Sequence, residues 1–221
     1  MHGAGSVRGA VLFKAHYLYF VQKVNIMKVI IFQGSPRKNG CTATLVKPFL
    51  SELENNGLEV KTISLYEKNI SPCVECYQCQ NKLGEYDCSI SDDMYDIADE
   101  ILMADYFILA TPIFIWYCTA QMKAMLDRFY GLHKYYGENH GSSLLAGKKC
   151  GIIATCGYDL EYGISPFEDG IKRFCEHFKI EYIGKAAVQR NAGDDASKFE
   201  TDDSKKVVID FAKNIISCCK L

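Results

Sequence analysis

The stretch that decides the fold reads VIIFQGSPRKNGCT and runs from Val29 to Thr42. It opens with four apolar residues, three of them β-branched, which is typical of a strand buried on both faces. This run ends before Gly34, and a helical pattern starts near Thr42. Hydroxyl, amide and basic side chains fill the gap, beside a helix N-terminus whose unpaired N–H groups and dipole favour anions. The stretch predicts a strand, a phosphate-binding loop and a helix, although an ordinary strand-to-helix turn would also fit these residues taken alone.

Strand-like and helical patterns alternate along the rest of the chain. The expected strands are residues 29–32, 58–65, 106–110, 149–155 and 181–188, and the expected helices are residues 42–56, 91–102, 119–130, 165–179 and 201–218. Ser91 is expected to cap the second helix, with Asp92 and Asp93 favourably placed against its dipole. Ser165 and Pro166 are expected to start the fourth helix. This alternation predicts an α/β fold with a parallel sheet that is covered on both faces.

Length and composition narrow the class of protein. A chain of 221 residues suits one α/β domain, and a net charge of −2 from 25 basic and 27 acidic residues argues against a nucleic-acid partner. The apolar runs in residues 1–26 are too short to span a bilayer, and no membrane partner is expected. The 11 cysteines indicate reduced thiols in the cytoplasm, where clustered cysteines favour metal or redox chemistry.

The chain divides into an extension and one domain. Residues 1–26 are predicted to be an N-terminal extension, disordered or translated from upstream, because Met27-Lys28-Val29 looks like a natural start. Residues 27–221 are predicted to form a single domain with a cysteine-rich insert at residues 71–90.

Three loops should meet where the expected strands end, because ligands of parallel sheets bind at the carboxyl edge near the change in strand order. These loops are residues 34–42, 111–117 and 155–158. The second loop holds three aromatic side chains, which suit stacking on a planar ring, although an aromatic core or interface is the alternative. Neither a G-x-G-x-x-G fingerprint nor a P-loop is present. A phosphate loop facing an aromatic loop favours FMN.

Four motifs resemble one known family, the flavodoxin-like NADPH-dependent FMN reductases. They are Gly34-Ser35-Pro36-Arg37, Thr111-Pro112-Ile113-Phe114, Ala120-Gln121-Met122-Lys123 and Asp127-Arg128. The resemblance extends from residue 27 to the C-terminus. It implies a flavodoxin-like three-layer sandwich with a five-stranded parallel sheet of order 2-1-3-4-5, bound FMN, and NAD(P)H as the electron donor.

The resemblance also implies which residues hold FMN. Phosphate contacts are expected from Ser35, Arg37, Asn39, Gly40, Cys41 and Thr42. Ring contacts are expected from Thr111, Pro112, Ile113, Phe114, Ile115, Trp116, Thr155, Cys156 and Gly157. Cys41 stands where relatives commonly carry Asn, and a thiol is a poorer donor, so its contact is expected to be weak. Ile115 stands where a second large aromatic is frequent, which leaves stacking to Phe114 and Trp116. No side chain is expected to act as a catalytic acid or base, because the flavin carries the chemistry.

The most distinctive chemistry is Cys73-x2-Cys76-x2-Cys79, followed by Cys88. Three thiolates at this spacing can bind one face of a [4Fe-4S] cluster, with Cys88 as the fourth ligand. The segment resembles the iron–sulfur flavoprotein branch of the family, although the eight residues between Cys79 and Cys88 exceed the usual spacing there. Free, redox-active thiols and a zinc site are the alternatives.

Together these expectations describe an FMN-dependent oxidoreductase. Electrons from NAD(P)H would pass to a small, quinone-like acceptor or to the [4Fe-4S] cluster. The main alternative is a non-catalytic electron-transfer flavoprotein partnered with ferredoxin, and a weaker one is a thiol or metal sensor. The resemblance implies a homodimer or homotetramer, with residues 131–147 and the cysteine segment as candidate interfaces. His133 and His140 in that long loop are expected to be surface residues.

Overall fold

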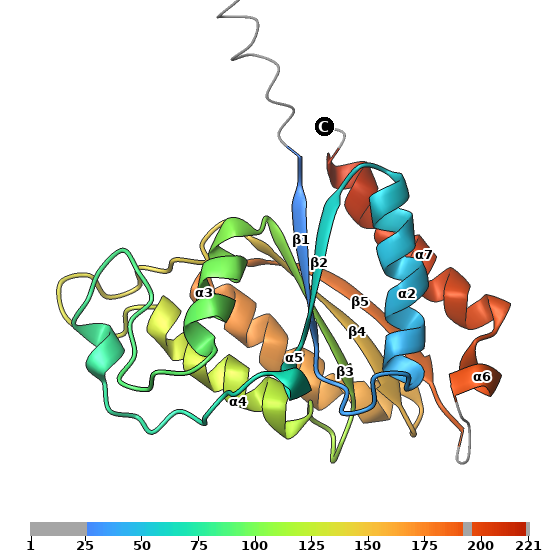
Figure 1. Cartoon of the computed structure of the whole chain (residues 1–221), viewed down its shortest axis with the longest axis horizontal. Helices are drawn as coiled ribbons and strands as arrows, with labels where there is room; N and C mark the ends of the chain where they lie inside the picture. The colour runs from blue at the N-terminus through green and yellow to red at the C-terminus, as the bar shows by residue number, and fades with distance from the viewer. Residues whose placement is uncertain (1–25, 192–195, 220–221) are drawn as a thin grey trace, which may run out of the picture.

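A five-stranded parallel sheet forms the centre of the computed structural model, which describes residues 26–191 and 196–219 (Figure 1). The strands are β1 (Lys28–Gln33), β2 (Glu59–Ser64), β3 (Tyr106–Pro112), β4 (Lys149–Cys156) and β5 (Glu181–Gln189). They follow the order β2-β1-β3-β4-β5, and every neighbouring pair is parallel. The predicted flavodoxin-like α/β fold is confirmed. Of the predicted N-terminal extension, all but residue 26 lies outside the described residues.

Helices cover both faces of this sheet, as expected. On one face lie α2 (Cys41–Asn55) and α7 (Asp202–Cys219), and on the other lie α3 (Met94–Met103), α4 (Ala120–Arg128) and α5 (Leu160–Phe178) (Figure 1). The short helical pieces are η1 (Leu65–Glu67), η2 (Gln78–Gln80), η3 (Phe129–Leu132) and α6 (Ala196–Phe199). Within the described ranges, no helix is both long enough and apolar enough to cross a membrane.

Strand β1 shows why the opening stretch decides the fold. Val29 and Ile31 pack with α2 and α7, whereas Ile30 and Phe32 pack with α3, α4 and α5. Alternate residues of a strand point to opposite faces, so a run that is apolar throughout is buried on both sides. All four side chains are at most 2% exposed. The strand is fixed at the middle of the molecule, and the loop that follows it is held at the carboxyl edge of the sheet.

The expected start of helix α5 was wrong. The helix begins at Leu160 rather than at Ser165, and Pro166 lies inside it. The carboxylate of Asp159 accepts a hydrogen bond from the Tyr162 amide at 3.0 Å and caps the helix five residues earlier than predicted. The helix therefore starts directly after the third loop of the carboxyl edge.

Candidate functional site

The three predicted loops meet through Thr155 at the end of β4. Its hydroxyl lies 3.0 Å from the Thr42 hydroxyl, and both oxygens are buried. Its carbonyl accepts a hydrogen bond of 2.8 Å from the Ile113 amide. Thr155 thus joins the start of α2 to the loop after β3, and the residues predicted from strand ends do come together.

The phosphate loop is braced by its neighbours. The Gly34 amide donates to the Ala110 carbonyl at 2.8 Å, and the Thr119 hydroxyl donates to the Gly34 carbonyl at 2.6 Å. A Cβ at Gly34 would lie 3.0 Å from the Thr119 hydroxyl, so a larger residue would have to displace the start of α4. Ser35 is 5% exposed, and its hydroxyl exchanges two hydrogen bonds of 3.2 Å with the backbone of Arg37. The loop is preformed.

The N-terminus of α2 suits a phosphate. Gly40 is the N-cap residue and provides no side-chain hydrogen bond, so the first-turn amides are left to an outside acceptor. Arg37 and Asn39 are exposed beside it and add donors. Cys41 is 2% exposed and packs in the core between α2 and α7, which leaves only its backbone amide for a ligand. The Cys41 thiol was expected to be a weak phosphate contact, and its place in the core leaves it none to make.

A tight turn forms the tip of the aromatic loop. Phe114 and Tyr117 exchange backbone hydrogen bonds of 2.8 and 3.1 Å around Ile115 and Trp116, whose φ angles are +49° and +61°. Two consecutive positive φ values are typical of a type I′ hairpin turn. A β-branched residue rarely adopts this conformation, and strain of this kind gathers at functional sites. Ile115 is 83% exposed, so the turn presents an apolar side chain to solvent.

The ring of Trp116 packs on two tyrosines. It stacks on Tyr158 with ring centroids 5.7 Å apart and an interplanar angle of 6°, and it meets the edge of Tyr162 at 5.7 Å. Phe114 is 52% exposed. Stacking of a flavin on Phe114 and Trp116 stays a prediction. The tyrosine partners of Trp116 were missed because Tyr158 lies in the third loop and Tyr162 in the first turn of α5.

A hollow of about 270 Å³ lies between these loops. Its lining residues are Pro112, Ile113, Phe114, Thr155, Cys156, Gly157, Arg190 and Asn191. Six of the eight are predicted ring contacts. Thr111, also predicted, is fully buried, and its hydroxyl donates to the Pro112 carbonyl at 2.9 Å. Arg190 and Asn191 follow β5 and were missed, although the rule that ligands bind at strand ends also applies to that strand. An apolar wall with backbone amides and a guanidinium suits a flavin ring.

The four cysteines of the predicted metal site line one small hollow at the C-terminal end of α4. Cys73 and Cys76 are exposed, Cys88 is half-buried and Cys79 is buried. Across residues 26–191 and 196–219, no three His, Cys, Asp or Glu side chains lie close enough together to hold a metal ion. A zinc ion needs four ligands on one atom, whereas each thiolate of a [4Fe-4S] cluster binds its own iron. Four thiols spread around one hollow therefore fit a cluster better than zinc.

Two of these thiols have shifted pKa values. Burial raises the pKa of Cys79, and the nearby Cys73 and Cys88 thiols act in the same direction. A hydrogen bond of 3.0 Å with the Ser89 hydroxyl lowers the pKa of Cys76. Cys76 is accordingly the readier thiolate and metal ligand of the two.

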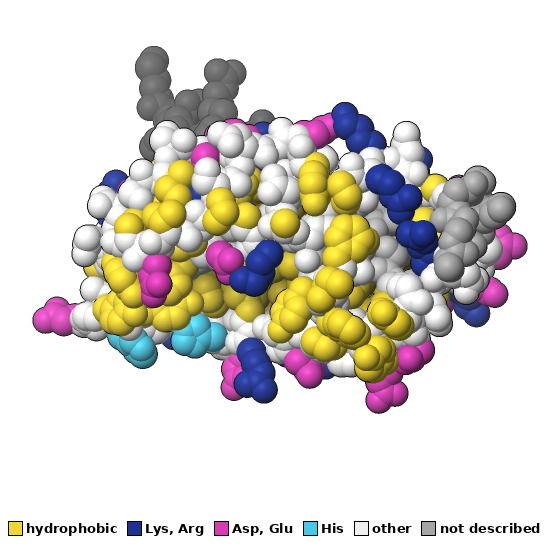
Figure 2. All heavy atoms as spheres, turned by 90° about the horizontal axis from the view of Figure 1, so that it is seen from below, with side chains coloured by type: hydrophobic (Ala, Val, Ile, Leu, Met, Phe, Trp, Pro, Cys, Tyr) yellow, Lys and Arg dark blue, Asp and Glu magenta, His cyan; other side chains and the backbone are white. Residues whose placement is uncertain are grey.

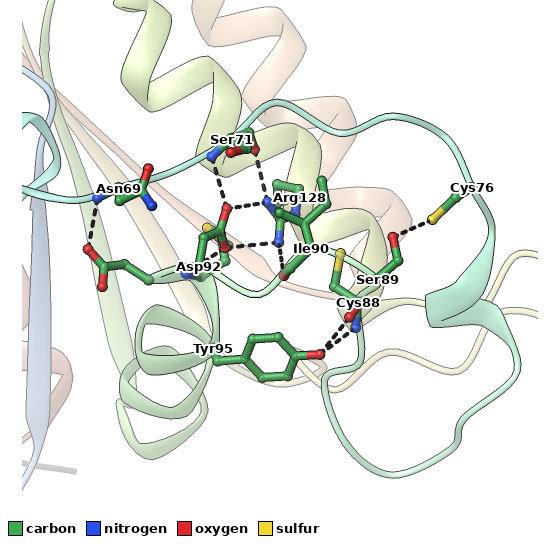
Figure 3. Close-up of polar contacts among 11 residues, drawn as sticks. Asn69, Ser71, Cys76, Cys88, Ser89, Ile90, Asp92, Tyr95 and Arg128 are labelled. Atoms are coloured by element: carbon green, nitrogen blue, oxygen red, sulfur yellow. Dashed lines mark hydrogen bonds and ion pairs between the residues drawn. The ribbon is translucent and has the colours of Figure 1, made fainter.

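A buried ion pair closes the neck of the cysteine segment (Figure 3). Arg128 binds Asp92 through two hydrogen bonds of 2.7 and 3.1 Å, and both side chains are 1% exposed. Arg128 also donates to the carbonyls of Ser71, at 2.9 Å, and of Ile90, at 3.2 Å. Asp92 accepts from the Ser71 amide at 2.9 Å. This pair, called here the Asp92–Arg128 clasp, holds the two ends of the segment together.

The clasp explains a second correction. Helix α3 begins at Met94, and Ser91 does not cap it; the Met94 amide donates instead to the Asp92 carboxylate at 3.1 Å. Burial would raise the pKa of Asp92, but the hydrogen bonds from Arg128 and the Ser71 amide outweigh it and lower the pKa. Asp92 was predicted as a charge beside the helix dipole, and its role in an ion pair needs the three-dimensional contact with Arg128.

The long loop after α4 holds the cysteine turn η2. The Gln80 amide group donates to the carbonyls of Tyr130, at 3.2 Å, and His133, at 3.0 Å, and accepts from the Tyr135 amide at 2.8 Å. The ammonium of Lys134, 3% exposed, donates to the Cys79 carbonyl. The loop and the cysteine segment are therefore one packed unit.

His133 was expected at the surface, and the structure corrects this. It is 1% exposed, and neither ring nitrogen has a hydrogen-bond partner. Burial lowers its pKa to about 4, with the His177 charge acting in the same direction. His133 directly follows η3 and is buried beneath the rest of the loop. Its polar neighbours in the sequence do not indicate this burial.

Comparison with known proteins places the fold and the site in a class. The family model of NADPH-dependent FMN reductases matches residues 27–163, and the chain belongs to this family. The likeness to an iron-sulfur flavoprotein of Archaeoglobus fulgidus, 32% identical over 162 residues, places it in the iron–sulfur flavoprotein branch. That match covers 65% of this chain and 72% of the relative.

Other comparisons agree with this assignment. An iron-sulfur flavoprotein of Methanocaldococcus jannaschii is 38% identical over 102 residues, which cover 46% of this chain and about half of that protein, 51%. RosB with bound 8-demethyl-8-formylriboflavin-5'-phosphate superposes with a TM-score of 0.68 at 16% identity, covering 88% of this chain and 79% of RosB. An FMN-dependent NADH-azoreductase from Bacillus anthracis gives 0.64 at 17% identity, covering 86% and 99%. The two solved structures show the shared fold.

Proposed function

We propose that the chain is an FMN-dependent oxidoreductase that takes electrons from NAD(P)H. The observation that carries the proposal is the hollow between Pro112 and Gly157, which adjoins a helix N-terminus without a side-chain cap. A ring site beside a phosphate site is what FMN requires. Membership of the NADPH-dependent FMN reductase family supports the same conclusion.

The chain's own residues bind and orient the cofactor. The amides at the start of α2, with Ser35, Arg37 and Asn39, hold the phosphate. The backbone from Pro112 to Phe114, and Thr155 to Gly157, borders the ring. Bound FMN supplies hydride acceptance and one-electron transfer, and the protein supplies orientation, water exclusion and electrostatic tuning.

The acceptor is either a small, quinone-like molecule or a [4Fe-4S] cluster held by Cys73, Cys76, Cys79 and Cys88. The cluster is supported by four thiols around one hollow and by positive φ angles at Glu75 and Tyr77, which flank Cys76. The names of the archaeal relatives also support it. Transfer to ferredoxin without a nicotinamide is the second candidate.

We further propose a homodimer or homotetramer in the cytoplasm. All eleven cysteines are free thiols, which suits a reducing compartment. The face that carries the strand ends is rich in hydrophobic side chains (Figure 2), as expected of a surface covered by a second copy.

Anaerobic purification tests the cofactors, and stopped-flow mixing tests the reaction. We expect flavin and iron in the purified protein, a cluster EPR signal after reduction, and bleaching of the flavin by NADPH or NADH. Arg37→Ala should lower the FMN content, whereas Lys47→Ala, at an exposed position on α2, should not. Flavin that neither nicotinamide bleaches would refute the reductase and favour the ferredoxin-linked carrier. Flavin without iron would refute the cluster and leave the cysteines as free thiols.

A further inference from the structure

Two buried donors without partners line the cysteine hollow. The Nε atom of Arg128 and the hydroxyl of Tyr86 are buried, and neither has a hydrogen-bond partner. The two residues are 2% and 6% exposed. Buried polar groups are nearly always paired, so two such orphans on one hollow indicate an acceptor that binds there.

The Asp92–Arg128 clasp uses every N–H group of the Arg128 guanidinium except the one on Nε. A guanidinium has five N–H groups in a rigid fork. Four of them are used by the carboxylate of Asp92 and the carbonyls of Ser71 and Ile90. The fifth, on Nε, has no partner in a side chain that the other four hold fixed. It cannot turn toward water without breaking the clasp.

The ring of Tyr86 is fixed in a similar way. It meets Tyr95 edge-on with centroids 5.2 Å apart, and a Cβ at Gly131 would lie 2.8 Å from the Tyr86 ring. Burial raises the pKa of the Tyr86 hydroxyl, and the nearby Cys88 acts in the same direction whereas Arg128 opposes it. Although both side chains are near, neither forms a hydrogen bond with the hydroxyl. Its O–H group is therefore held beside the thiols and left unpaired.

We propose that Arg128 Nε and the Tyr86 hydroxyl donate hydrogen bonds to the sulfur atoms of the metal centre and raise its reduction potential. The inference rests on the proposed function, because it requires the cluster at the four cysteines. Thiolate and sulfide sulfur atoms gain negative charge on reduction. Fixed N–H and O–H donors stabilise that charge and shift the potential upward. Tyr86 and Arg128 would therefore act on the reduction potential of the cluster through its sulfur atoms, without binding iron themselves.

Tyr86→Phe tests the inference, because it removes the hydroxyl and keeps the ring that packs on Gly131. The readout is the midpoint potential of the cluster from an EPR-monitored redox titration. We expect a shift to a more negative potential that corresponds to about a tenfold change in the one-electron equilibrium, or about 59 mV. In D2O, pulsed EPR should show exchangeable deuterium coupled to the reduced cluster in the wild type. Tyr86→Phe should lose the coupling of the tyrosine hydroxyl and keep that of Arg128 Nε.

Tyr106→Phe is the matched control. Tyr106 is 1% exposed at the start of β3 and packs in the core on the α2 and α7 face of the sheet, whereas Tyr86 packs in the core on the other face. Its hydroxyl accepts a hydrogen bond from the Cys219 thiol at 3.5 Å. Its removal should leave the potential and the deuterium coupling unchanged. Arg128→Lys keeps the charge but breaks the fork, so Tyr86→Phe is the decisive variant if Arg128→Lys does not fold.

The outcomes separate the two proposals. A wild-type protein that binds no iron after anaerobic reconstitution would overturn the proposed cluster and this inference with it. A wild type with a cluster, and a Tyr86→Phe variant with the same potential and the same deuterium coupling, would overturn the inference alone. An equal shift in Tyr106→Phe would also overturn it, because the effect would then be unrelated to the hollow.

Discussion

His133 brings a pH dependence that belongs to one residue. Its ring lies 4.5 Å from that of His177 and 4.9 Å from that of Phe178, measured between centroids. Burial, with the charges of His177, His140 and Lys179 in the same direction, lowers its pKa to about 4, whereas the unfolded chain has about 6.5. Between these values the unfolded chain binds the proton and the folded chain does not. Stability is therefore complete above about pH 6.5 and falls as the pH drops toward 4.

We expect His133→Phe to remove this loss. Urea unfolding at pH 7 and pH 5 should show the wild type losing roughly 2 kcal/mol over that interval and the variant losing much less. His140→Phe is the control. His140 is exposed in the same loop, and its charge is a lesser cause of the His133 shift than burial, so most of the wild-type dependence should remain. An unchanged pH dependence in His133→Phe would assign the effect to other groups.

The phosphate loop allows a comparison of two residues that were both predicted to hold FMN. Cys41→Ala should change the FMN dissociation constant less than about twofold, since the thiol packs in the core and the amide is retained. Arg37→Ala should weaken binding at least about tenfold, because a hydrogen bond to a charged group contributes about 1.5 to 3 kcal/mol. Quenching of FMN fluorescence measures both. A Cys41→Ala effect as large as that of Arg37→Ala would contradict the placement of the thiol.

Single residues could be predicted where a local rule acts. Pro112 to Phe114 and Thr155 to Gly157 were found because strand ends of a parallel sheet converge, and this needs only the strand pattern. Arg190 was missed, since nothing in its own neighbourhood distinguishes it from other surface arginines. His133 and Tyr86 were beyond prediction, because their burial depends on segments far away in the sequence.

Between elements, the Asp92–Arg128 clasp is the contact whose loss should matter most. Asp92→Ala leaves a buried guanidinium without its partner and should lower the free energy of unfolding by about 3 to 5 kcal/mol. Amide hydrogen exchange in residues 71–90 should rise, because both ends of the cysteine segment depend on this pair.

A surface ion pair on α4, the helix that carries Arg128, provides the control. Lys123 and Asp127 form an i,i+4 pair in which the side chains are 53% and 44% exposed. Asp127→Ala should cost no more than about 0.5 kcal/mol and leave exchange in the cysteine segment unchanged. If Asp92→Ala were as mild as Asp127→Ala, the clasp would have no role in holding the segment.

The elements themselves were largely predictable. Each strand was found to within two residues. The apolar runs of β1, β3 and β4 leave little ambiguity, and β2 and β5, which mix polar and apolar residues, were found from their shorter apolar patterns. Helix starts were less certain: α5 carries Pro166 in its second turn, and a proline was taken for the beginning. The start of α5 is set by the capping residue Asp159. Several acidic residues lie nearby in the sequence, so this one could not be singled out as the cap.

The whole molecule presents an apolar face at the carboxyl edge of the sheet (Figure 2). Phe114, Ile115, Tyr117, Tyr158 and Tyr162 are each more than half exposed. Analytical ultracentrifugation should find a dimer or tetramer, and Ile115→Lys should shift it toward the monomer, since a charge at an apolar contact is costly. Met103→Lys, at an apolar site that is 67% exposed at the end of α3, should not. A monomeric wild type would contradict the proposed assembly.

The neck formed at Ser71 and Ile90 gives the cysteine segment some freedom to evolve. Its two ends are tied to one guanidinium, so the chain between them can grow or shrink at a modest cost in loop-closure entropy. The eight residues between Cys79 and Cys88 lie inside this segment and add no strand to the sheet. A segment attached in this way can change in length without disturbing the rest of the fold. Selection can change the spacing of its four thiols while the five-stranded sheet and its helices stay as they are.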